Sequence, residues 1–230
     1  MLSSLQKNFR LRSFVRRDGR MTAAQRRAYT EQWPRWGLSL EQGLLNETQV
    51  FGRTAPCLLE IGFGNGQSLL AAALAYPELN FIGVETHQPG IGSVLLGINA
   101  HALTNVRVYN ADAIDVLEKA LPDASLAGIQ LFFPDPWQKR RHHARRLIQA
   151  ALVNQLADKL IPGGSLHLAT DWEDYAKHMH QVLAQEKKLM NLAAPHAFAE
   201  RSCYRPILSK FERRALREGR QIWELQFARC

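Results

Sequence analysis

The feature that most constrains this chain is an apolar run that ends in a cluster of glycines. Residues 58–66 read Leu-Leu-Glu-Ile-Gly-Phe-Gly-Asn-Gly, and a helical pattern begins directly afterwards. Only glycine lets a backbone turn this tightly and approach a ligand this closely. The segment therefore predicts a buried strand, a tight turn at Gly62, Gly64 and Gly66, and the start of a helix.

Two details of this turn distinguish between ligands. The helix after Gly66 opens with Gln67 and Ser68, so the third glycine of the dinucleotide-binding pattern Gly-x-Gly-x-x-Gly is missing. Glu60 adds a carboxylate just before the first glycine, and a carboxylate suits a cation better than a phosphate. S-adenosylmethionine carries an ammonium and a sulfonium but no phosphate, so the turn favours this methyl donor over NAD. A strand–helix turn without a ligand is the alternative.

The order of elements predicts the fold class. From residue 58 onward apolar runs alternate with helical patterns, which is typical of repeated βα units. The expected strands are residues 58–62, 80–85, 106–110, 128–133, 165–170 and 221–227. The expected helices are residues 67–76, 87–101, 113–120, 143–160 and 173–189. The prediction is a Rossmann-like α/β domain over residues 51–230, with a mostly parallel sheet and helices on both faces.

Residues 1–50 form a separate segment in this interpretation. They read as a basic N-terminal arm followed by short helices, because Trp33-Pro34-Arg35-Trp36-Gly37 disfavours a long helix there.

The distribution of charge indicates a polyanionic partner. The formal net charge is +8 and the pI is near 9.7. Basic residues gather in three segments, namely residues 1–36, 139–146 and 201–220. Solvated faces usually carry both signs, so we expect a nucleic acid to be bound, with a generic basic surface as the alternative.

Other classes of protein fit the composition less well. No apolar run approaches the roughly 20 residues of a membrane helix, and no secretory signal is evident, although the N-terminal arginines leave a transit peptide open. Cys57, Cys203 and Cys230 are odd in number and far apart. They form no metal framework, so we expect a cytoplasmic protein without a membrane or a metal. Nothing fixes an oligomeric state, and a monomer is favoured.

Acidic residues recur where the expected strands end. In sheets of this kind ligands bind outside the carboxyl ends of the strands. The residues there are Glu60, Glu85, Asp112, Asp135 and Asp171. Crowded, unpaired carboxylates repel one another, and a cationic ligand removes that difficulty. Glu85 lies about 20 residues beyond the glycines, as a ribose-binding acid does, or it caps a helix. Asp112 receives an adenine amino group or caps the helix that follows.

A second motif, residues 130–137, reads Gln-Leu-Phe-Phe-Pro-Asp-Pro-Trp. The two prolines restrain the backbone around Asp135 and position its carboxylate. Trp137 can stack on a base, or can simply be half buried in a proline turn. The basic run 138–146 follows at once and predicts phosphate contacts beside the site. No carboxylate or cysteine ligand set accompanies His142 and His143, which disfavours a metal.

Together these motifs resemble the bacterial tRNA (guanine-N7-)-methyltransferase family. The resemblance rests on Glu-Ile-Gly-Phe-Gly-Asn-Gly, Phe-Phe-Pro-Asp-Pro-Trp-Gln-Lys-Arg-Arg-His, Ala-Thr-Asp-Trp and Ser-Lys-Phe-Glu, in this order. It extends from about Arg12 to Phe227, and Pro-Asp-Pro-Trp with its basic tail is the specific part. It implies methylation of N7 of the guanine at position 46 in the tRNA variable loop, with S-adenosylmethionine as the donor. It also implies the class I methyltransferase fold, whose mostly parallel sheet has seven strands.

The resemblance also implies roles for individual residues. The methyl-donor site would comprise Glu60, Glu85, Asp112 and Asp135 with the three glycines. The tRNA side would comprise Lys139, Asp171, Ser209, Lys210, Phe211 and Glu212, and the RNA-contact loop Arg141, His142, His143, Arg145 and Arg146. The chain departs from the family at Ser209, where threonine is usual, and at Ala215, where glycine is usual.

Asp135 is the expected catalytic residue. Guanine N7 has an in-plane lone pair and no proton to remove, so a general base is not obligatory. The product ring gains positive charge, which a carboxylate stabilises electrostatically; alternatively Asp135 accepts hydrogen bonds from the guanine N1–H and amino edge. The chain lacks the double proline of amino-methylating enzymes and the Pro-Cys of C5-methylating enzymes. A non-catalytic RNA-binding subunit is disfavoured because the donor-site acids are all present.

Overall fold

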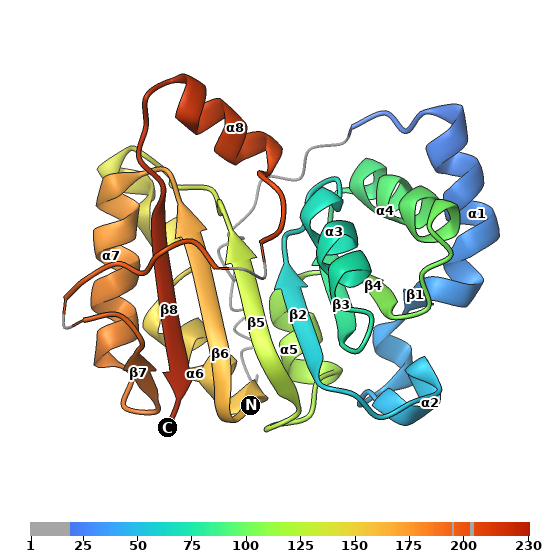
Figure 1. Cartoon of the computed structure of the whole chain (residues 1–230), viewed down its shortest axis with the longest axis horizontal. Helices are drawn as coiled ribbons and strands as arrows, with labels where there is room; N and C mark the ends of the chain where they lie inside the picture. Colours follow the sequence, from blue (N-terminus) through green and yellow to red (C-terminus); the bar gives the residue numbers. More distant parts are fainter. Residues whose placement is uncertain (1–18, 195, 203–204) are drawn as a thin grey trace, which may run out of the picture.

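The computed structural model describes residues 19–194, 196–202 and 205–230. This part of the chain forms one eight-stranded sheet in the order β1-β4-β3-β2-β5-β6-β8-β7 (Figure 1). The strands are β1 Gly37–Leu38, β2 Cys57–Ile61, β3 Asn80–Glu85, β4 Val106–Asn110, β5 Leu126–Phe132, β6 Leu160–Thr170, β7 Leu189–Asn191 and β8 Trp223–Arg229. The helices are α1 Ala23–Trp36, α2 Glu47–Phe51, α3 Gln67–Ala75, α4 Gln88–Ala100, α5 Ala113–Lys119, α6 Ala150–Lys159, α7 Glu173–Gln185 and α8 Lys210–Arg217. Two 3₁₀ helices, η1 Leu40–Gln42 and η2 Arg140–Arg145, complete the set.

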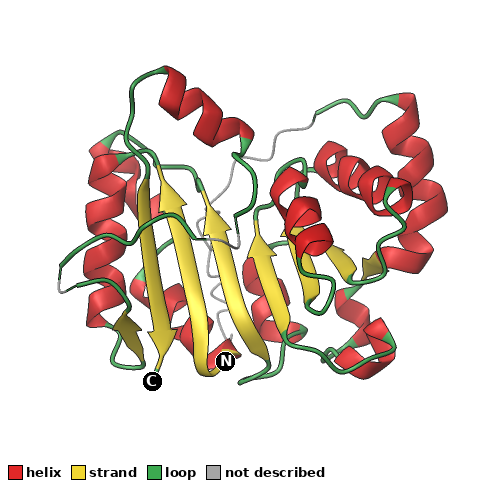
Figure 2. Cartoon of the chain, in the orientation of Figure 1, coloured by secondary structure: helices red, strands yellow, loops and turns green. Residues whose placement is uncertain are grey.

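The predicted α/β fold with a mostly parallel sheet is confirmed. Strands β1 to β6 pair in parallel, and only β8 runs antiparallel to its neighbours β6 and β7. Helices cover both faces (Figure 2). The sheet has eight strands where seven were expected, because Gly37–Leu38 adds a two-residue strand beside β4. A strand this short shows no alternation in the sequence that would reveal it.

Successive residues of the central strands supply two separate cores. Leu58 of β2 and Phe81 of β3 pack with α1, α3 and α4 on one face. Their neighbours Leu59 and Ile82 pack with α5, α6 and α7 on the other. Every residue of β2 is buried, since helices cover the sheet on both sides, and this explains the continuous apolar run in the sequence.

The N-terminal segment contains a longer helix than the sequence predicted. Pro34 lies inside the 14-residue helix α1 rather than before it. The proline falls in the last turn, so the helix loses one hydrogen bond near its end and stops two residues later. Thr22 and Gln25 form a capping box at the start, and the Tyr29 and Trp33 rings stack 5.0 Å apart.

Helix α1 packs against α4, and the β1 strand that follows it pairs with β4. The division of the chain at residue 50 stays a prediction. The arm residues Lys7, Arg10, Arg12, Arg16 and Arg17 lie outside the described residues, as does Cys203. Cys57 is buried, which raises the pKa of its thiol.

The helix expected over residues 143–160 is interrupted. Residues 140–145 form η2, and α6 begins only at Ala150. Between them the Ile148 N–H donates to Tyr175 Oη at 3.2 Å, and the Ile148 carbonyl pairs with the His178 ring at 2.8 Å. These bonds to α7 replace helical ones, which local sequence cannot reveal. The expected apolar stripe nevertheless holds, because Ile148, Leu152, Leu156 and Leu160 are all buried.

The carboxyl ends of the parallel strands gather at one edge of the sheet, and α8 lies across that edge (Figure 1). Among the described helices, none combines the length and apolar character needed to cross a lipid bilayer. The same residues contain no group of three or more His, Cys, Asp or Glu side chains suited to hold a metal ion.

Candidate active site

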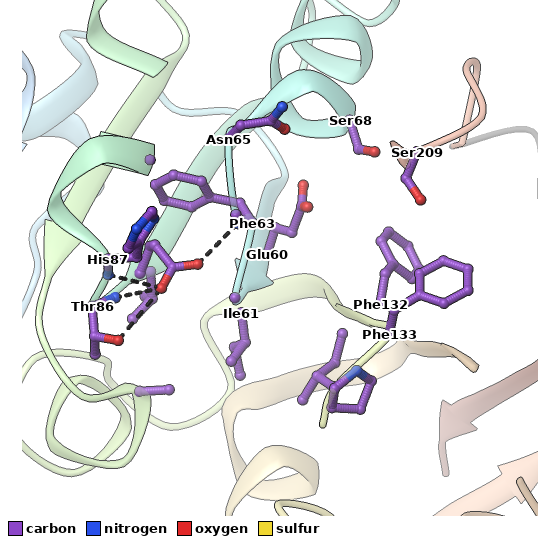
Figure 3. Close-up of a pocket in the computed structure, with 18 of the residues that line it drawn as sticks. Glu60, Ile61, Phe63, Asn65, Ser68, Thr86, His87, Phe132, Phe133 and Ser209 are labelled. Atoms are coloured by element: carbon purple, nitrogen blue, oxygen red, sulfur yellow. Dashed lines mark hydrogen bonds between the residues drawn. The ribbon is translucent and has the colours of Figure 1, made fainter. Parts of the chain in front are cut away.

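A cavity of about 490 Å³ opens at this edge, with walls from β2, β3, β5, the start of α4 and α8 (Figure 3). A volume of this size is typical of sites for a cofactor or other small molecule. It brings together most of the residues that the sequence singled out. They are Glu60, Gly62, Gly64, Glu85, Asp112, Asp135, Ser209, Lys210 and Phe211.

The three glycines of the turn are required for two different reasons, backbone conformation and helix packing. Each has a positive φ, of 74° at Gly62, 61° at Gly64 and 75° at Gly66. A Cβ on Gly62 or Gly64 would have open space, so these positions require glycine for backbone conformation, and both line the cavity. A Cβ on Gly66 would meet the Val94 side chain at 2.2 Å. Gly66 therefore serves the packing of α3 on α4, and the structure does not place it in the wall of the cavity.

Glu85 fixes the glycine loop to the end of β3. Its Oε2 accepts from the Gly64 N–H at 2.9 Å, and its Oε1 accepts from the N–H groups of Thr86 at 2.7 Å and His87 at 3.0 Å (Figure 3). The Thr86 hydroxyl adds a longer bond to Oε1 at 3.4 Å. Oε2 accepts only from the Gly64 N–H, so it keeps an acceptor site for a ligand hydroxyl. Its binding to ribose stays a prediction.

Glu60 is the most unusual carboxylate of the cavity. The residue is 5% exposed, and its Oε2 lacks a partner in the part of the chain described. The pKa of this carboxyl is raised to about 8, chiefly by burial; Arg205 partly opposes the rise and Glu85 adds to it. A buried, unsatisfied acid that faces a cavity is costly unless a cation approaches it. The site therefore fits a ligand with an ammonium group, as S-adenosylmethionine has.

Asp112 fulfils the capping role and also lines the cavity. Its Oδ1 accepts from the Ile114 N–H at 3.0 Å, at the start of α5. The second carboxylate oxygen remains for a ligand, and its contact with adenine stays a prediction.

Asp135 stands in a strained and restrained segment. Phe133 and Trp137, on either side of it, have φ values of 52° and 46°, which bulky side chains rarely adopt. Asp135 lines the cavity and is exposed. Within the described residues no hydrogen bond or ion pair engages its carboxylate. The side chain is thus held at the cavity by backbone constraint and is available to a substrate.

Trp137 does not line the cavity, contrary to its expected role as a base-stacking surface. The Arg145 guanidinium lies over its ring at 4.6 Å, and His142 meets it edge-on at 5.8 Å. These contacts make Trp137 a support for the basic loop η2.

Arg146 differs from the other residues of the predicted RNA-contact loop, because it is buried and engaged within the protein. It is 3% exposed, and its guanidinium donates to the Asp174 carboxylate and to the Pro136 carbonyl at 3.0 Å. A guanidinium engaged in this way is not available to a phosphate. It instead ties the Pro-Asp-Pro segment to α7. The basic side chains that η2 and its cap expose to solvent, fully or in part, are Lys139, Arg140, Arg141, His142, His143 and Arg145. The RNA contacts expected of this loop stay predictions.

Glu212 is engaged within the protein, and its contact with substrate stays a prediction. It is 2% exposed and forms a capping box with Ser209: the Glu212 N–H donates to Ser209 Oγ at 3.1 Å, and the Ser209 N–H donates to Glu212 Oε2 at 3.2 Å. The Ser-x-x-Glu spacing is the sequence signal of such a box. Glu212 therefore orients α8, whose first residues Lys210 and Phe211 line the cavity.

Arg205 is a residue that sequence reasoning missed. It is 2% exposed, and it pairs with Glu212 Oε2 at 2.5 Å and with Glu224 of β8. Its guanidinium lies over the rings of Phe132 at 4.7 Å and Phe133 at 5.5 Å. One buried cation thus joins α8, β8 and the end of β5.

Asp171 and Ala215 lie outside the cavity. Asp171 pairs with the Arg220 guanidinium at 3.1 Å, and its contact with substrate stays a prediction. Ala215 is buried within α8 and has no positive φ, so the exchange of the family's usual glycine strains nothing here.

Comparison with known proteins agrees with this site. A family model described as a putative methyltransferase matches residues 54–225. The solved structure of the 16S rRNA methyltransferase KamB has a TM-score of 0.57 at 14% identity, covering 79% of this chain and 91% of that one, which shows a shared fold. Fold and site together define a class I methyltransferase that uses S-adenosylmethionine.

Closer relatives identify the family. The tRNA (guanine-N(7)-)-methyltransferase of Alcanivorax borkumensis is 51% identical over 218 residues, covering 95% of this chain and 91% of that protein. Its counterpart in Ectopseudomonas mendocina is 52% identical over 219 residues, covering 95% and 92%. The chain belongs to the tRNA (guanine-N(7)-)-methyltransferase family.

The raised pKa of Glu60 predicts a dependence on pH. In the folded chain this carboxyl keeps its proton up to about pH 8, whereas the unfolded chain releases it near pH 4.5. The free energy of unfolding should therefore fall as pH rises through that window. A ligand ammonium pairs with the ionised form, so affinity for S-adenosylhomocysteine should rise by up to about tenfold per pH unit between pH 6 and 7.5.

Calorimetric titration of the wild type and of Glu60→Gln checks this expectation. The Gln variant should bind S-adenosylhomocysteine about ten- to a hundredfold more weakly, as for the loss of a charge-assisted hydrogen bond. Its affinity should also not rise with pH. Equal slopes in both proteins would assign the pH effect to another group.

Proposed function

We propose that this protein transfers the methyl group of S-adenosylmethionine to N7 of guanine at position 46 in the tRNA variable loop. Its relatives are named for N7 methylation of guanine in tRNA and match nearly the whole chain. The sequence resemblance described above supplies the position within tRNA.

One observation carries the proposal within the structure. Glu60 and Asp135 line the same cavity, the first buried without a partner and the second exposed and unengaged within the described residues. Two such carboxylates suit a reaction with a cationic donor and an acceptor that becomes cationic. The exposed basic side chains of η2 stand directly after Asp135 in the chain, where the phosphates of an RNA would approach.

The chain's own residues have distinct tasks in this reaction. S-adenosylmethionine supplies a methyl group on a sulfonium cation. Glu60 would hold the ammonium end, and the open glycine loop with Glu85 and Asp112 would form the wall for the nucleoside end. Holding donor and acceptor in line provides much of the rate acceleration.

Asp135 acts on the acceptor side. Guanine N7 attacks with its own lone pair, and positive charge develops on the ring as the bond forms. A fixed carboxylate stabilises this charge, or accepts hydrogen bonds from the N1–H and amino edge. Pro134 and Pro136, together with the Arg146 bond to the Pro136 carbonyl, keep it in place without reorganisation.

Mass mapping of bulk tRNA tests the activity and its position together. The protein is incubated with unmodified tRNA and labelled S-adenosylmethionine, and the digests are sequenced by mass spectrometry. We expect one 7-methylguanosine, in the variable loop. Label on an adenosine or on an exocyclic amine would support another RNA base methyltransferase, and no label with intact tRNA binding would support a non-catalytic subunit.

Substitution of Asp135 by Asn tests the catalytic role. The exchange preserves shape but removes the charge, so the methylation rate should fall by about a hundredfold, as for other single electrostatic stabilisers. Affinity for S-adenosylhomocysteine should change little. Turnover close to the wild type would remove Asp135 from the chemistry.

Adjacent arginines provide a matched test of the tRNA surface. Arg145→Gln should leave stability within about 0.5 kcal/mol, weaken tRNA binding, and reduce the slope of log affinity against log salt by about one. Arg146→Gln should lower the melting temperature, because the Pro136 carbonyl loses its donor at a cost of about 1–3 kcal/mol. Filter binding at several salt concentrations and thermal melts separate the two. An unchanged salt slope for Arg145→Gln would place the tRNA elsewhere.

A further inference from the structure

Two phenylalanines stand together in the wall of the cavity. Phe133, at the end of β5, and Phe211, in the first turn of α8, both line it. Their ring centroids are 6.3 Å apart and their planes are within 19° of parallel. Phe211 is 55% exposed. An aromatic side chain this exposed, on the rim of a cavity and next to a parallel ring, presents a flat apolar face to an incoming ligand.

The pair is held in place by the buried cation beneath it. The Arg205 guanidinium lies over the Phe133 ring at 5.5 Å and also binds Glu212, the neighbour of Phe211 in α8. Phe133 itself has a φ of 52°, and such strain persists only where surrounding contacts enforce it. The two rings come from segments far apart in the sequence, yet one ion cluster fixes both.

The other aromatic near Asp135 is excluded from this role. Trp137 does not line the cavity. Phe133 lies two residues before Asp135 and lines the same cavity as Asp135 and Phe211. Arg205 lies over the Phe133 ring, so the exposed Phe211 ring supplies the face that is open to a base. A base on this face would share the cavity with the Asp135 carboxylate, whereas a base on Trp137 would lie outside it.

The chemistry of the acceptor fits such a surface. An enzyme that acts on a base takes it out of its stack, and aromatic side chains replace the lost stacking. Methylation at N7 makes the guanine ring cationic, and the face of an aromatic ring attracts a cation. Stacking would therefore strengthen as the reaction proceeds, which favours the transition state over the bound substrate.

We infer that Phe133 and Phe211 form the stacking surface for the target guanine and place it beside Asp135. This inference rests on the proposed function and adds a specific pair of positioning residues to it. It does not depend on which role Asp135 plays.

The test begins with the wild-type protein and bulk tRNA, mapped by mass spectrometry. If no guanine is methylated, the proposed function itself fails. If one is, that position is replaced by 2-aminopurine, whose fluorescence is quenched by stacking, in a tRNA assembled from two halves. Fluorescence is then measured in the complex with S-adenosylhomocysteine, and methylation kinetics are measured on the unsubstituted tRNA.

The variants are Phe211→Leu, Phe133→Leu and Phe211→Tyr, with Leu216→Ala as the control. Leu216 is another exposed apolar side chain of α8, at 50%, but it does not line the cavity. Because Phe211 is exposed, its replacement should leave the fold intact, and affinity for S-adenosylhomocysteine verifies this for each variant.

We expect both Leu variants to lose about ten- to a hundredfold in kcat/KM, corresponding to the stacking of one base, and to relieve the quenching of 2-aminopurine. Phe211→Tyr and Leu216→Ala should resemble the wild type in both measurements. The inference would be overturned if the wild type methylates guanine and the Phe211→Leu variant keeps both its kcat/KM and the quenching of 2-aminopurine. A loss of activity with quenching unchanged would do so as well, since it indicates an effect on structure alone.

Discussion

The wall of the cavity on the α8 side depends on one buried guanidinium. Arg205 is nearly without solvent contact, and a buried charge is tolerated only when opposite charges surround it. Glu212 and Glu224 provide them, and His167 also pairs with Glu224, so the cluster joins α8 to β8 and β6. Removing one partner would leave the others uncompensated. The ends of β5 and α8 are thereby held as a unit, although nothing in the local sequence connects them.

The carboxylates at the edge of the sheet are not equivalent, although the sequence presents them as one group. Glu85 and Asp112 already accept backbone N–H groups, and Asp171 has Arg220 as its partner. For Glu60 and Asp135 no hydrogen bond or ion pair is found among the described residues. Glu85 and Asp112 therefore help to give the cavity its shape, whereas Glu60 and Asp135 give it an affinity for positive charge. Some of the acidic side chains at the edge of the sheet therefore have a structural role.

The sequence predicted the elements whose pattern is local. The buried strand β2, the glycine turn and the central helices follow from apolar periodicity and from backbone conformations that glycine permits. The predictions were wrong where contacts between residues far apart in the chain determine the local conformation. Ile148 leaves the helical pattern because α7 binds its backbone, and Arg146 turns inward because Asp174 and the Pro136 carbonyl hold it. The capping box at Ser209, by contrast, has a local signal in the Ser-x-x-Glu spacing.

Helix α1 has a consequence for how the protein can vary. Gln25, in its first turn, lines the cavity and donates from Nε2 to Ser93 Oγ of α4 at 2.9 Å. The matched family model begins only at residue 54, so one side of the pocket is built by residues that this model does not include. A substitution at Gln25 would therefore alter the wall of the pocket and its link to α4 while leaving the central sheet unchanged.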